Sequence, residues 1–190
     1  MNNKNRVCPV EIAGSLDTKI RRWLQNPVKI LKPYVKKGMT AMDIGCGPGF
    51  FTLPLAELTG ENGKVIAADL QEGMLNKLLE KIKGTEIEER IKLHKCEQDK
   101  IGANEKVDFI LAFYMVHEVP DQGSFLKELK SIMREDGTIF IVEPKLFHVS
   151  KKAFEKMLRL AESIGLKPVE FPHLPFSWAV VLKKNIIKIN

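Results

Sequence analysis

The sequence predicts an α/β protein with a doubly wound, mostly parallel sheet of seven strands, helices on both faces, and an antiparallel C-terminal hairpin. Three observations predict this fold. From residue 38 onward, short apolar runs alternate with amphipathic segments at helical spacing. The run 107–113 is almost wholly apolar, as central parallel strands are. The alternation closes with strand, proline-rich turn and strand, which predicts the hairpin.

The predicted strands are separated by residues typical of turns. Gly60 to Gly63 precedes the second strand, and the segment Pro-His-Leu-Pro at 172–175 separates the last two. A parallel strand needs a crossover connection, so the segments between the first five strands should contain helices. The predicted strands cover residues 40–44, 64–68, 91–94, 107–113, 138–142, 167–171 and 177–184.

Four helices are predicted after the first strand. The first runs from Phe50 to about Thr59. Residues 135–137 are expected to close the third, and Gly165 is placed to end the fourth in the left-handed conformation. The other three carry one apolar face each: Met74, Leu75, Leu78, Leu79 and Ile82; Phe125, Leu126, Leu129, Ile132 and Met133; Phe154, Met157, Leu158, Ala161 and Ile164.

Length and composition predict one domain over residues 1–190, with an N-terminal helical lid at 1–38 and a core at 39–184. No apolar run is long enough to span a bilayer. No membrane association is therefore expected. Three cysteines make no even disulfide framework, which predicts a reduced, cytoplasmic setting.

The net charge of +6 is concentrated in the N-terminal segment. Residues 1–38 hold nine Lys or Arg and two acids, so they carry +7 and the remainder −1. Such a segment can attract nucleic acid, anionic lipid or an acidic substrate, or it can be a solvated helical face. Because apolar residues recur around Asn26-Pro27, we expect two short helices that cover the site rather than a nucleic-acid arm.

The strongest local pattern is the segment Asp43-Ile-Gly-Cys-Gly-Pro-Gly49 between the first strand and the first helix. Glycines let the backbone turn sharply and let a ligand approach it closely. Asp69 follows the second strand, where a carboxylate can accept hydrogen bonds from both hydroxyls of a ribose. The pattern therefore predicts a nucleoside-containing cofactor at the carboxyl edge of the sheet.

Two cofactor classes fit this layout, and a structural turn without a ligand is a third possibility. The dinucleotide fingerprint G-x-G-x-x-G needs its third glycine at position 50, where this chain has Phe. A pyrophosphate gains nothing from the nearby Asp43, whereas the ammonium of a methionine moiety does. Asp69 does not separate the two classes. The turn favours a methionine-derived cofactor over NAD.

These segments resemble class I S-adenosylmethionine (SAM)-dependent methyltransferases. Residues 43–49 resemble their first motif, and Asp69-Leu-Gln-Glu-Gly-Met74 resembles the second. The resemblance runs from about residue 26 to 184, is greatest to the small-molecule branch related to ubiquinone/menaquinone C-methyltransferases, and implies a Rossmann-like sheet. The SAM-binding residues it implies are Asp43, Gly45, Cys46, Gly47, Gly49, Asp69, Leu70, Met74, Glu97, Gln98, Ala112 and Phe113.

Methyl transfer needs a general base only when the nucleophile must lose a proton. His117, after the fourth strand, is the candidate because imidazole titrates near neutrality. It can equally be a residue that bonds locally or lines the cofactor pocket. Tyr114 and Glu118 are weaker candidates. The histidines show no metal spacing, so no metal is expected.

The segment Phe113-Tyr-Met-Val116 lacks the Asn/Asp-Pro-Pro-aromatic tetrapeptide common in amino-group methyltransferases, which disfavours adenine or glutamine acceptors. Thiol-based arsenic methylation is disfavoured because the cysteines are dispersed. A small-molecule acceptor is therefore predicted, with a homodimer as a possibility. The alternatives are a non-catalytic SAM-binding or regulatory subunit, and an RNA or protein methyltransferase that uses the basic N-terminal segment.

Overall fold

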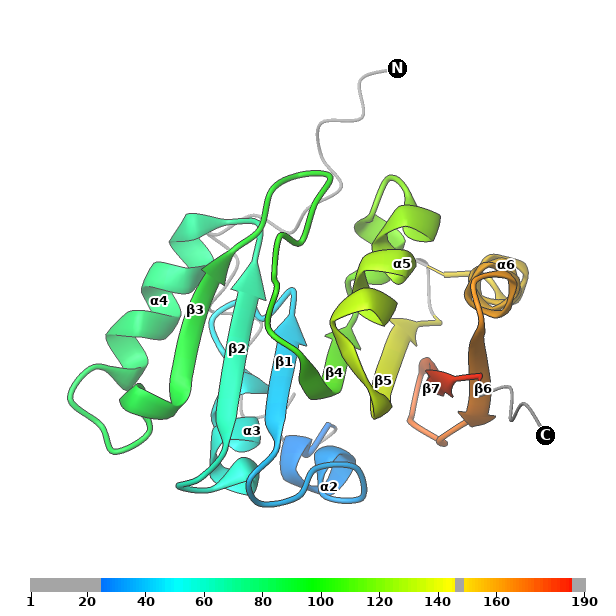
Figure 1. Cartoon of the computed structure of the whole chain (residues 1–190). Helices are drawn as coiled ribbons and strands as arrows, with labels where there is room; N and C mark the ends of the chain where they lie inside the picture. Colours follow the sequence, from blue (N-terminus) through cyan, green and yellow to red (C-terminus); the bar gives the residue numbers. More distant parts are fainter. Residues whose placement is uncertain (1–24, 146–148, 186–190) are drawn as a thin grey trace. The chain divides into compact units, whose positions relative to one another are not determined.

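The computed structural model describes residues 25–145 and 149–185 (Figure 1). They form two compact units, one up to residue 98 and one from residue 99 onward. No helix within the described ranges is long and apolar enough to cross a membrane. The prediction of a single domain stays a prediction.

The strands of the first unit form a parallel sheet in the order β3-β2-β1. They are β1 (Thr40–Ile44), β2 (Lys64–Asp69) and β3 (Ile91–Lys95). All but the first residue of both β1 and β2 are buried, as the predicted apolar runs require. The parallel register brings the carboxyl ends of β1 and β2 to the same edge, since Ile44 lies opposite Ala68.

Two longer helices, α3 (Thr52–Thr59) and α4 (Glu72–Ile82), pack on these strands, and a short 3-10 turn, η2 (Glu88–Arg90), precedes β3. The predicted apolar face of α4 is confirmed at four of its five positions. The exception is Leu79, which is 39% exposed because it lies at the margin of the buried stripe, one position beyond Leu78.

The N-terminal segment is described only from residue 25. Helix α2 (Pro27–Leu31) begins at the predicted break, where the Asn26 side chain accepts the N–H of Lys29 at 3.0 Å. Pro27 suits the first helical position because its missing N–H would have no intrahelical partner. Leu31 is fully buried. The first predicted helix of the lid lies outside the described residues.

The second unit has strands in the order β4-β5-β7-β6. Strands β4 (Val107–Phe113) and β5 (Met133–Pro144) are parallel, and β7 (Ser177–Lys184) is antiparallel to both β5 and β6 (Leu166–Glu170). The antiparallel C-terminal hairpin is therefore confirmed. Its register places β7 against β5, so β6 forms the edge.

The helices of the second unit are η3 (Val116–Glu118), α5 (Gln122–Ile132) and α6 (Lys151–Ser163). Helix α6 ends at the predicted glycine, since Gly165 has φ +79° and donates its N–H to Glu162 at 2.9 Å. Both helices begin with a side-chain cap, Asp121 for α5 and Ser150 for α6.

One turn prediction is wrong. Residues 135–137 were expected to close the helix that is now α5, but the helix ends at Ile132 and these residues belong to β5. The register explains the confusion, because the partners of Val107 and Phe109 are Met133 and Thr138. Between these two pairs β5 has three more residues than β4, and they form a bulge. The bulge has the polar composition of a turn.

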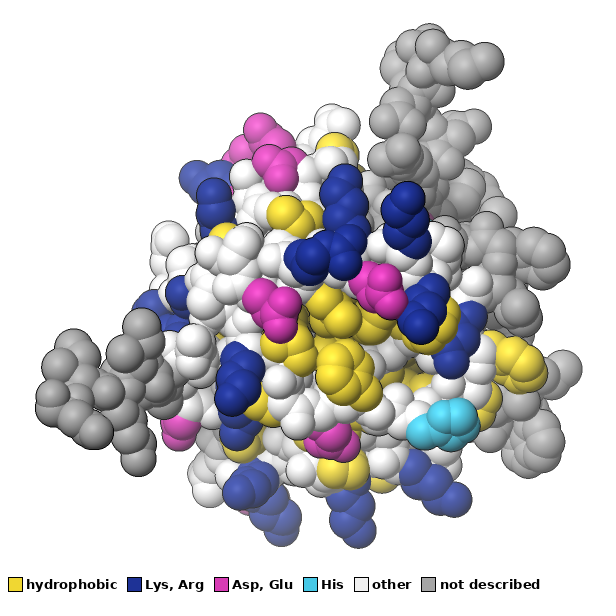
Figure 2. Space-filling view, turned by 90° about the vertical axis from the view of Figure 1, so that its right-hand side faces the viewer, with side chains coloured by type: hydrophobic (Ala, Val, Ile, Leu, Met, Phe, Trp, Pro, Cys, Tyr) yellow, Lys and Arg dark blue, Asp and Glu magenta, His cyan; other side chains and the backbone are white. Residues whose placement is uncertain are grey.

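The hairpin exposes three apolar side chains. Val169, Phe171 and Phe176 are 49%, 61% and 65% exposed. Figure 2 looks onto the side of the molecule where β6 and β7 lie in Figure 1, and hydrophobic side chains gather there among lysines and acids. Pro168 within β6 lacks an N–H, which suits an edge strand because it hinders pairing with another strand.

Candidate functional site

The glycine-rich turn follows β1 directly and is tied to β2. The N–H groups of Gly45 and Cys46 donate to the carbonyl oxygen of Ala68 at 2.8 and 3.0 Å. Gly45, Gly47 and Gly49 have φ values of +72°, +52° and +89°. Residues with a Cβ occupy this left-handed region at a cost, so the reversal of the chain between β1 and α3 requires glycine at these positions.

Two of these glycines differ in their surroundings. A Cβ at Gly49 would lie 2.5 Å from Cδ1 of Leu78, so this glycine allows α4 to pack closely against the turn. A Cβ at Gly47 would meet no heavy atom within 4 Å. Open space beside the backbone is what a closely approaching ligand needs, and Gly47 is the residue that borders it.

Asp69 ends β2 and holds the turn with its carboxylate. Its Oδ2 accepts the N–H of Gly47 at 2.9 Å, and its Oδ1 accepts the N–H of Gln71 at 2.8 Å. Burial raises the pKa of Asp69 above its ordinary 3.8, although the hydrogen bonds from Gln71 and Gly47 lower it. A carboxylate oxygen accepts more than one hydrogen bond, so each oxygen retains capacity for a ligand hydroxyl.

Asp43 joins the end of β1 to the start of α3. Only 2% of Asp43 is exposed, and its Oδ2 accepts the hydroxyl of Thr52 at 2.6 Å. Thr52 is the first residue of α3 and is fully buried. The two acids identified from the sequence, Asp43 and Asp69, thus lie at the carboxyl ends of the adjacent strands β1 and β2, and both lie beside the glycine-rich turn.

The other predicted cofactor residues of the first unit lie around this assembly. Met74 is 2% exposed on the inner face of α4, Leu70 is half-buried, and Glu97 and Gln98 are exposed just after β3. Cys46 is buried, and burial raises the pKa of its thiol well above the ordinary value. A neutral, buried thiol is a poor nucleophile, so Cys46 belongs to the turn and not to any thiol chemistry.

Two lysines stabilise the same region in ways that the sequence did not reveal. Lys81 on α4 donates to the carbonyl oxygen of Pro48 at 2.8 Å, and Lys95 at the end of β3 donates to the carbonyl oxygen of Leu70. The partners are 33 and 25 residues apart. No local pattern identifies such pairs, because only the packing of α4 and β3 brings them together.

In the second unit, the predicted residues Ala112 and Phe113 end β4 and are 0% and 7% exposed. The next residue, Tyr114, has φ +59°, which is an uncommon conformation for a bulky side chain. Its N–H donates to the carbonyl oxygen of Val142 at 2.7 Å, and its hydroxyl lies 2.6 Å from the hydroxyl of Ser177. These two bonds hold the strained backbone in place.

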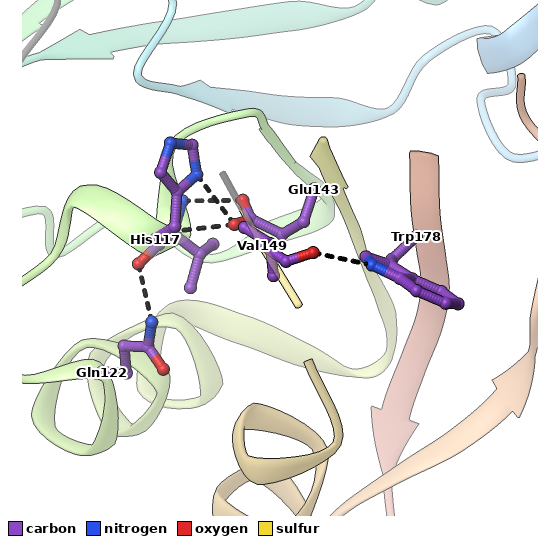
Figure 3. A network of polar contacts seen from close by, with 6 residues as sticks. His117, Gln122, Glu143, Val149 and Trp178 are labelled. Carbon is purple, nitrogen blue, oxygen red and sulfur yellow. Dashed lines mark hydrogen bonds and ion pairs between the residues drawn. The ribbon is translucent and has the colours of Figure 1, made fainter. Parts of the chain in front are cut away.

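A buried carboxylate organises the loop after β4. Glu143 on β5 is 3% exposed; its Oε1 accepts the N–H of Val116 at 3.0 Å and its Oε2 the N–H of His117 at 3.1 Å. The Nδ1 atom of His117 lies 2.8 Å from Oε2 of the same carboxylate. Figure 3 shows the imidazole and the carboxylate turned toward each other. Below them, the amide of Gln122 donates to the carbonyl oxygen of Val116.

The environment of His117 acts on its pKa in two directions. Burial lowers the pKa, but the hydrogen bond to Glu143 and the charges of Glu143 and Glu118 outweigh it, so the pKa is raised above 6.5. The side chain of His117 is 22% exposed. His117 is therefore an imidazole that titrates above its ordinary range and has one nitrogen engaged by an acid.

The predicted fifth strand ends at residue 142, one residue before Glu143, and sequence analysis predicts no function for Glu143. The available signal was an acid followed by Pro144 at the end of an apolar strand, which is too common to carry a prediction. Of the predicted second-unit residues, the structure places His117 against Glu143. Within residues 25–145 and 149–185, no group of three or more His, Cys, Asp or Glu side chains is arranged to hold a metal ion.

The start of α6 is held near the same strand by Trp178. Its indole N–H donates to the carbonyl oxygen of Val149 at 3.0 Å, and its ring stacks on Phe154 with centroids 5.8 Å apart. The ammonium of Lys145 lies 4.5 Å above the indole. Figure 3 shows the indole nitrogen of Trp178 pointing at the carbonyl oxygen of Val149.

A family model described as a methyltransferase domain matches residues 35–178. The chain belongs to the methyltransferase domain family. The matched range contains the glycine-rich turn, Asp69, His117 and Glu143. It also covers β1 to β6 in full and the first two residues of β7.

Curated relatives of this methyltransferase domain include two named demethylmenaquinone methyltransferase. The protein from Bacillus cereus is 28% identical over 123 residues, which are 65% of this chain and 51% of the relative. The protein from Lactobacillus johnsonii is 31% identical over 122 residues, 64% of this chain and 49% of the relative. The chain spans about half the length of the curated relatives it matches.

The structure is similar to a solved SAM-dependent methyltransferase from Aquifex aeolicus. The TM-score is 0.81 at 29% identity, over 92% of this chain and 98% of that one. The predicted fold, a Rossmann-like and mostly parallel seven-stranded sheet with flanking helices and an antiparallel C-terminal pair, is confirmed. The predicted methyltransferase family is confirmed by the family model, and the predicted fold by the similarity to a SAM-dependent methyltransferase.

Proposed function

We propose that this chain transfers a methyl group from SAM to a small-molecule acceptor. The observation that carries the proposal is the position of Asp69, whose carboxylate is bonded to the N–H of Gly47 beside open space at the glycine-rich turn. An acid at the end of β2 with remaining acceptor capacity suits the two hydroxyls of a ribose. The family match and the fold support the same assignment.

The turn fits SAM better than it fits a dinucleotide. A pyrophosphate site uses backbone N–H groups as donors to phosphate oxygens. Here the N–H groups of Gly45, Cys46, Gly47 and Gly49 all donate to oxygens of the protein itself. Asp43 and Asp69 would add negative charge next to phosphates, whereas the same charge favours an ammonium group.

The residues proposed to hold SAM are grouped by the part of the molecule they would contact. The turn and Asp43 would take the methionyl end, Asp69 the ribose, and the residues after β2 and β3 the adenine. Met74, which is 2% exposed, can offer only an edge of its side chain. The proposed contacts are Asp43, Gly45, Cys46, Gly47, Gly49, Asp69, Leu70, Met74, Glu97, Gln98, Ala112 and Phe113.

SAM supplies a methyl group on a sulfonium: the acceptor atom bonds to the methyl carbon, the carbon–sulfur bond breaks with its electron pair left on sulfur, and the acceptor's proton is released. His117 is proposed to take that proton at Nε2, because its Nδ1 is engaged by Glu143. A base that titrates near neutrality is matched to this task.

The proposed acceptor class is supported by the names of the curated relatives. Those relatives are named for demethylmenaquinone, so a hydroquinone ring is the first acceptor to test. A hydroquinone hydroxyl loses a proton when the neighbouring ring carbon is methylated, which would employ a general base. The soluble probe is 1,4-dihydroxynaphthalene kept reduced under nitrogen.

The cofactor is tested first, by thermal unfolding with SAM, S-adenosylhomocysteine or NAD. A ligand at about 100 times its Kd stabilises the folded state by about 2.7 kcal/mol. In a chain of this length that raises Tm by about 5–11 °C. SAM or its demethylated product should give the shift; a shift with NAD alone would refute the proposal.

Turnover is tested second, as formation of S-adenosylhomocysteine with the naphthalenediol and with a pool of small metabolites. Mass gains of one methyl group identify the acceptor. Binding of SAM with no turnover on any acceptor would favour the alternative, a non-catalytic SAM-binding or regulatory subunit.

Residues 1–24 of the predicted lid lie outside the described residues, and the lid stays a proposal. If the basic segment instead bound RNA, affinity for RNA would fall about a thousandfold or more between 50 and 200 mM salt.

Light scattering tests the proposed homodimer, for which Phe171 and Phe176 offer exposed apolar surface. We also propose a cytoplasmic location with no membrane partner, supported by the three cysteines of the sequence, which make no even disulfide framework.

A further inference from the structure

Glu143 makes more hydrogen bonds than a loop anchor needs. It accepts two backbone N–H groups, from Val116 and His117, and these alone would hold η3 against β5. The third contact, 2.8 Å from Oε2 to Nδ1 of His117, adds nothing to the backbone. Its effect is on the ring, whose orientation and tautomer are set by an acid at Nδ1.

We propose that Glu143 is a positioning residue for methyl transfer, which orients the His117 ring so that Nε2 takes the proton released by the acceptor. This inference rests on the proposed function. The proton moves from the acceptor to Nε2 and later to solvent, while Nδ1–H stays bonded to Glu143, so no proton is transferred to the carboxylate.

The surroundings of Glu143 hold its carboxylate in a fixed position. At 3% exposure it is shielded from solvent, and its two oxygens receive three donors. Buried hydrogen-bonded carboxylates keep a single geometry because every alternative leaves a donor without an acceptor. The backbone bonds fix the carboxylate, and the carboxylate in turn fixes the imidazole.

The charged groups that act on His117 come from two elements. Glu143 approaches from β5, and Glu118 belongs to η3 itself. From α5 the group at this loop is the uncharged Gln122, whose amide donates to the carbonyl oxygen of Val116 at 3.0 Å. Replacing Glu143 therefore removes the directly bonded charge and leaves burial as the stronger influence, which lowers the pKa of His117.

The test is Glu143→Gln, with Glu143→Asp as a graded variant and Glu128→Gln as the matched control. Glu128 also accepts a backbone N–H, from Ile101 at 2.7 Å, but does not bond to His117. NMR titration of the His117 ring, assigned with His117→Gln, gives a readout without acceptor or SAM. We expect the pKa of His117 to fall by at least about one pH unit in Glu143→Gln, less in Glu143→Asp, and not in Glu128→Gln.

The second readout is the pH profile of kcat/KM with 1,4-dihydroxynaphthalene. Activity requires neutral His117, so the acidic limb should move to lower pH in Glu143→Gln together with the NMR pKa, and the maximum should drop at least tenfold. His117→Gln should abolish the limb, and adding Glu143→Gln to it should cost no further activity. An unmoved limb, or losses that multiply in the double variant, would overturn the inference.

The two proposals fail differently. If Glu143 only anchors the loop, the NMR pKa of His117 stays in place in Glu143→Gln while the wild type still turns over. If the wild type binds no SAM and methylates nothing, the proposed function fails whatever the titration gives. If Glu143→Gln does not fold, Glu143→Asp decides through the same two readouts.

Discussion

Asp69 in the first unit and Glu143 in the second occupy equivalent positions in their sheets, and they serve different partners. Each is a buried acid near the end of a parallel strand, and each holds the loop that follows a neighbouring strand. The carboxylate of Asp69 accepts backbone N–H groups, those of Gly47 and Gln71. Glu143 accepts two backbone N–H groups and also an imidazole.

The difference separates binding from proton transfer. A carboxylate bonded to backbone amides has partners that do not titrate, so its geometry is constant over the physiological pH range. A carboxylate bonded to imidazole has a partner whose charge changes near neutrality. The first arrangement is suited to holding a ligand, and the second to moving a proton.

The largest effect on SAM binding is expected from Asp69→Asn. The amide replaces one acceptor oxygen with a donor that faces a backbone N–H, and a bond to a charged group contributes about 1.5–3 kcal/mol. SAM affinity should fall at least tenfold and the free energy of unfolding by about 2 kcal/mol, measured by calorimetry and urea denaturation. Glu143→Gln is the counterpart and should leave SAM affinity within about twofold. Equal losses of affinity would erase the comparison.

Substitutions at Gly47 and Gly49 should distinguish the glycine that borders the ligand from the glycine that allows close packing of α4. Gly49→Ala combines φ +89° with a Cβ 2.5 Å from Leu78, and should cost about 2–3 kcal/mol of stability. Gly47→Ala has φ +52° and open surroundings, and should cost about 1–2 kcal/mol. Only Gly47→Ala should lose SAM affinity beyond what stability explains. If Gly47→Ala binds SAM normally, the open space is not the cofactor site.

The His117–Glu143 pair should make stability depend on pH. The pKa of His117 is raised in the folded state above 6.5, so its stabilising contribution is complete below about pH 6.5 and is lost as pH rises through the folded value. The free energy of unfolding of wild type should therefore exceed that of His117→Gln by more at about pH 6 than at about pH 9. A difference that grows with rising pH would mean that burial lowers the pKa of His117 more than Glu143 raises it.

The smallest effect is expected from Trp178→Phe. The ring can still stack on Phe154, but the hydrogen bond from the indole to the carbonyl oxygen of Val149 is lost. A neutral hydrogen bond contributes about 1 kcal/mol, which is the expected loss in urea denaturation. The pKa of His117 should not move, because Trp178 orders the connection after β5 rather than the imidazole. A change in the pKa of His117 would show that the contacts of Trp178 influence the His117–Glu143 pair.

The sequence by itself determined the strands, the helices and the glycine-rich turn. Apolar alternation and turn residues are local features, and they placed β1 at its observed bounds and β4 from Val107 to Phe113. Gly165 was identified as a helix end because a positive φ is a property of one residue and its neighbours. The bulge at 135–137 defeated the same reasoning, since its composition is that of a turn.

Only the tertiary structure decided which side chains act together. Glu143 and His117 are 26 residues apart, and Asp69 and Gly47 are 22 apart, so no periodicity joins either pair. The sequence named three of these residues from their types, but it gave Glu143 no role. The physical reason is that a parallel sheet brings the carboxyl ends of distant strands to one edge. Strand register and burial then decide which acid meets a backbone amide and which meets an imidazole.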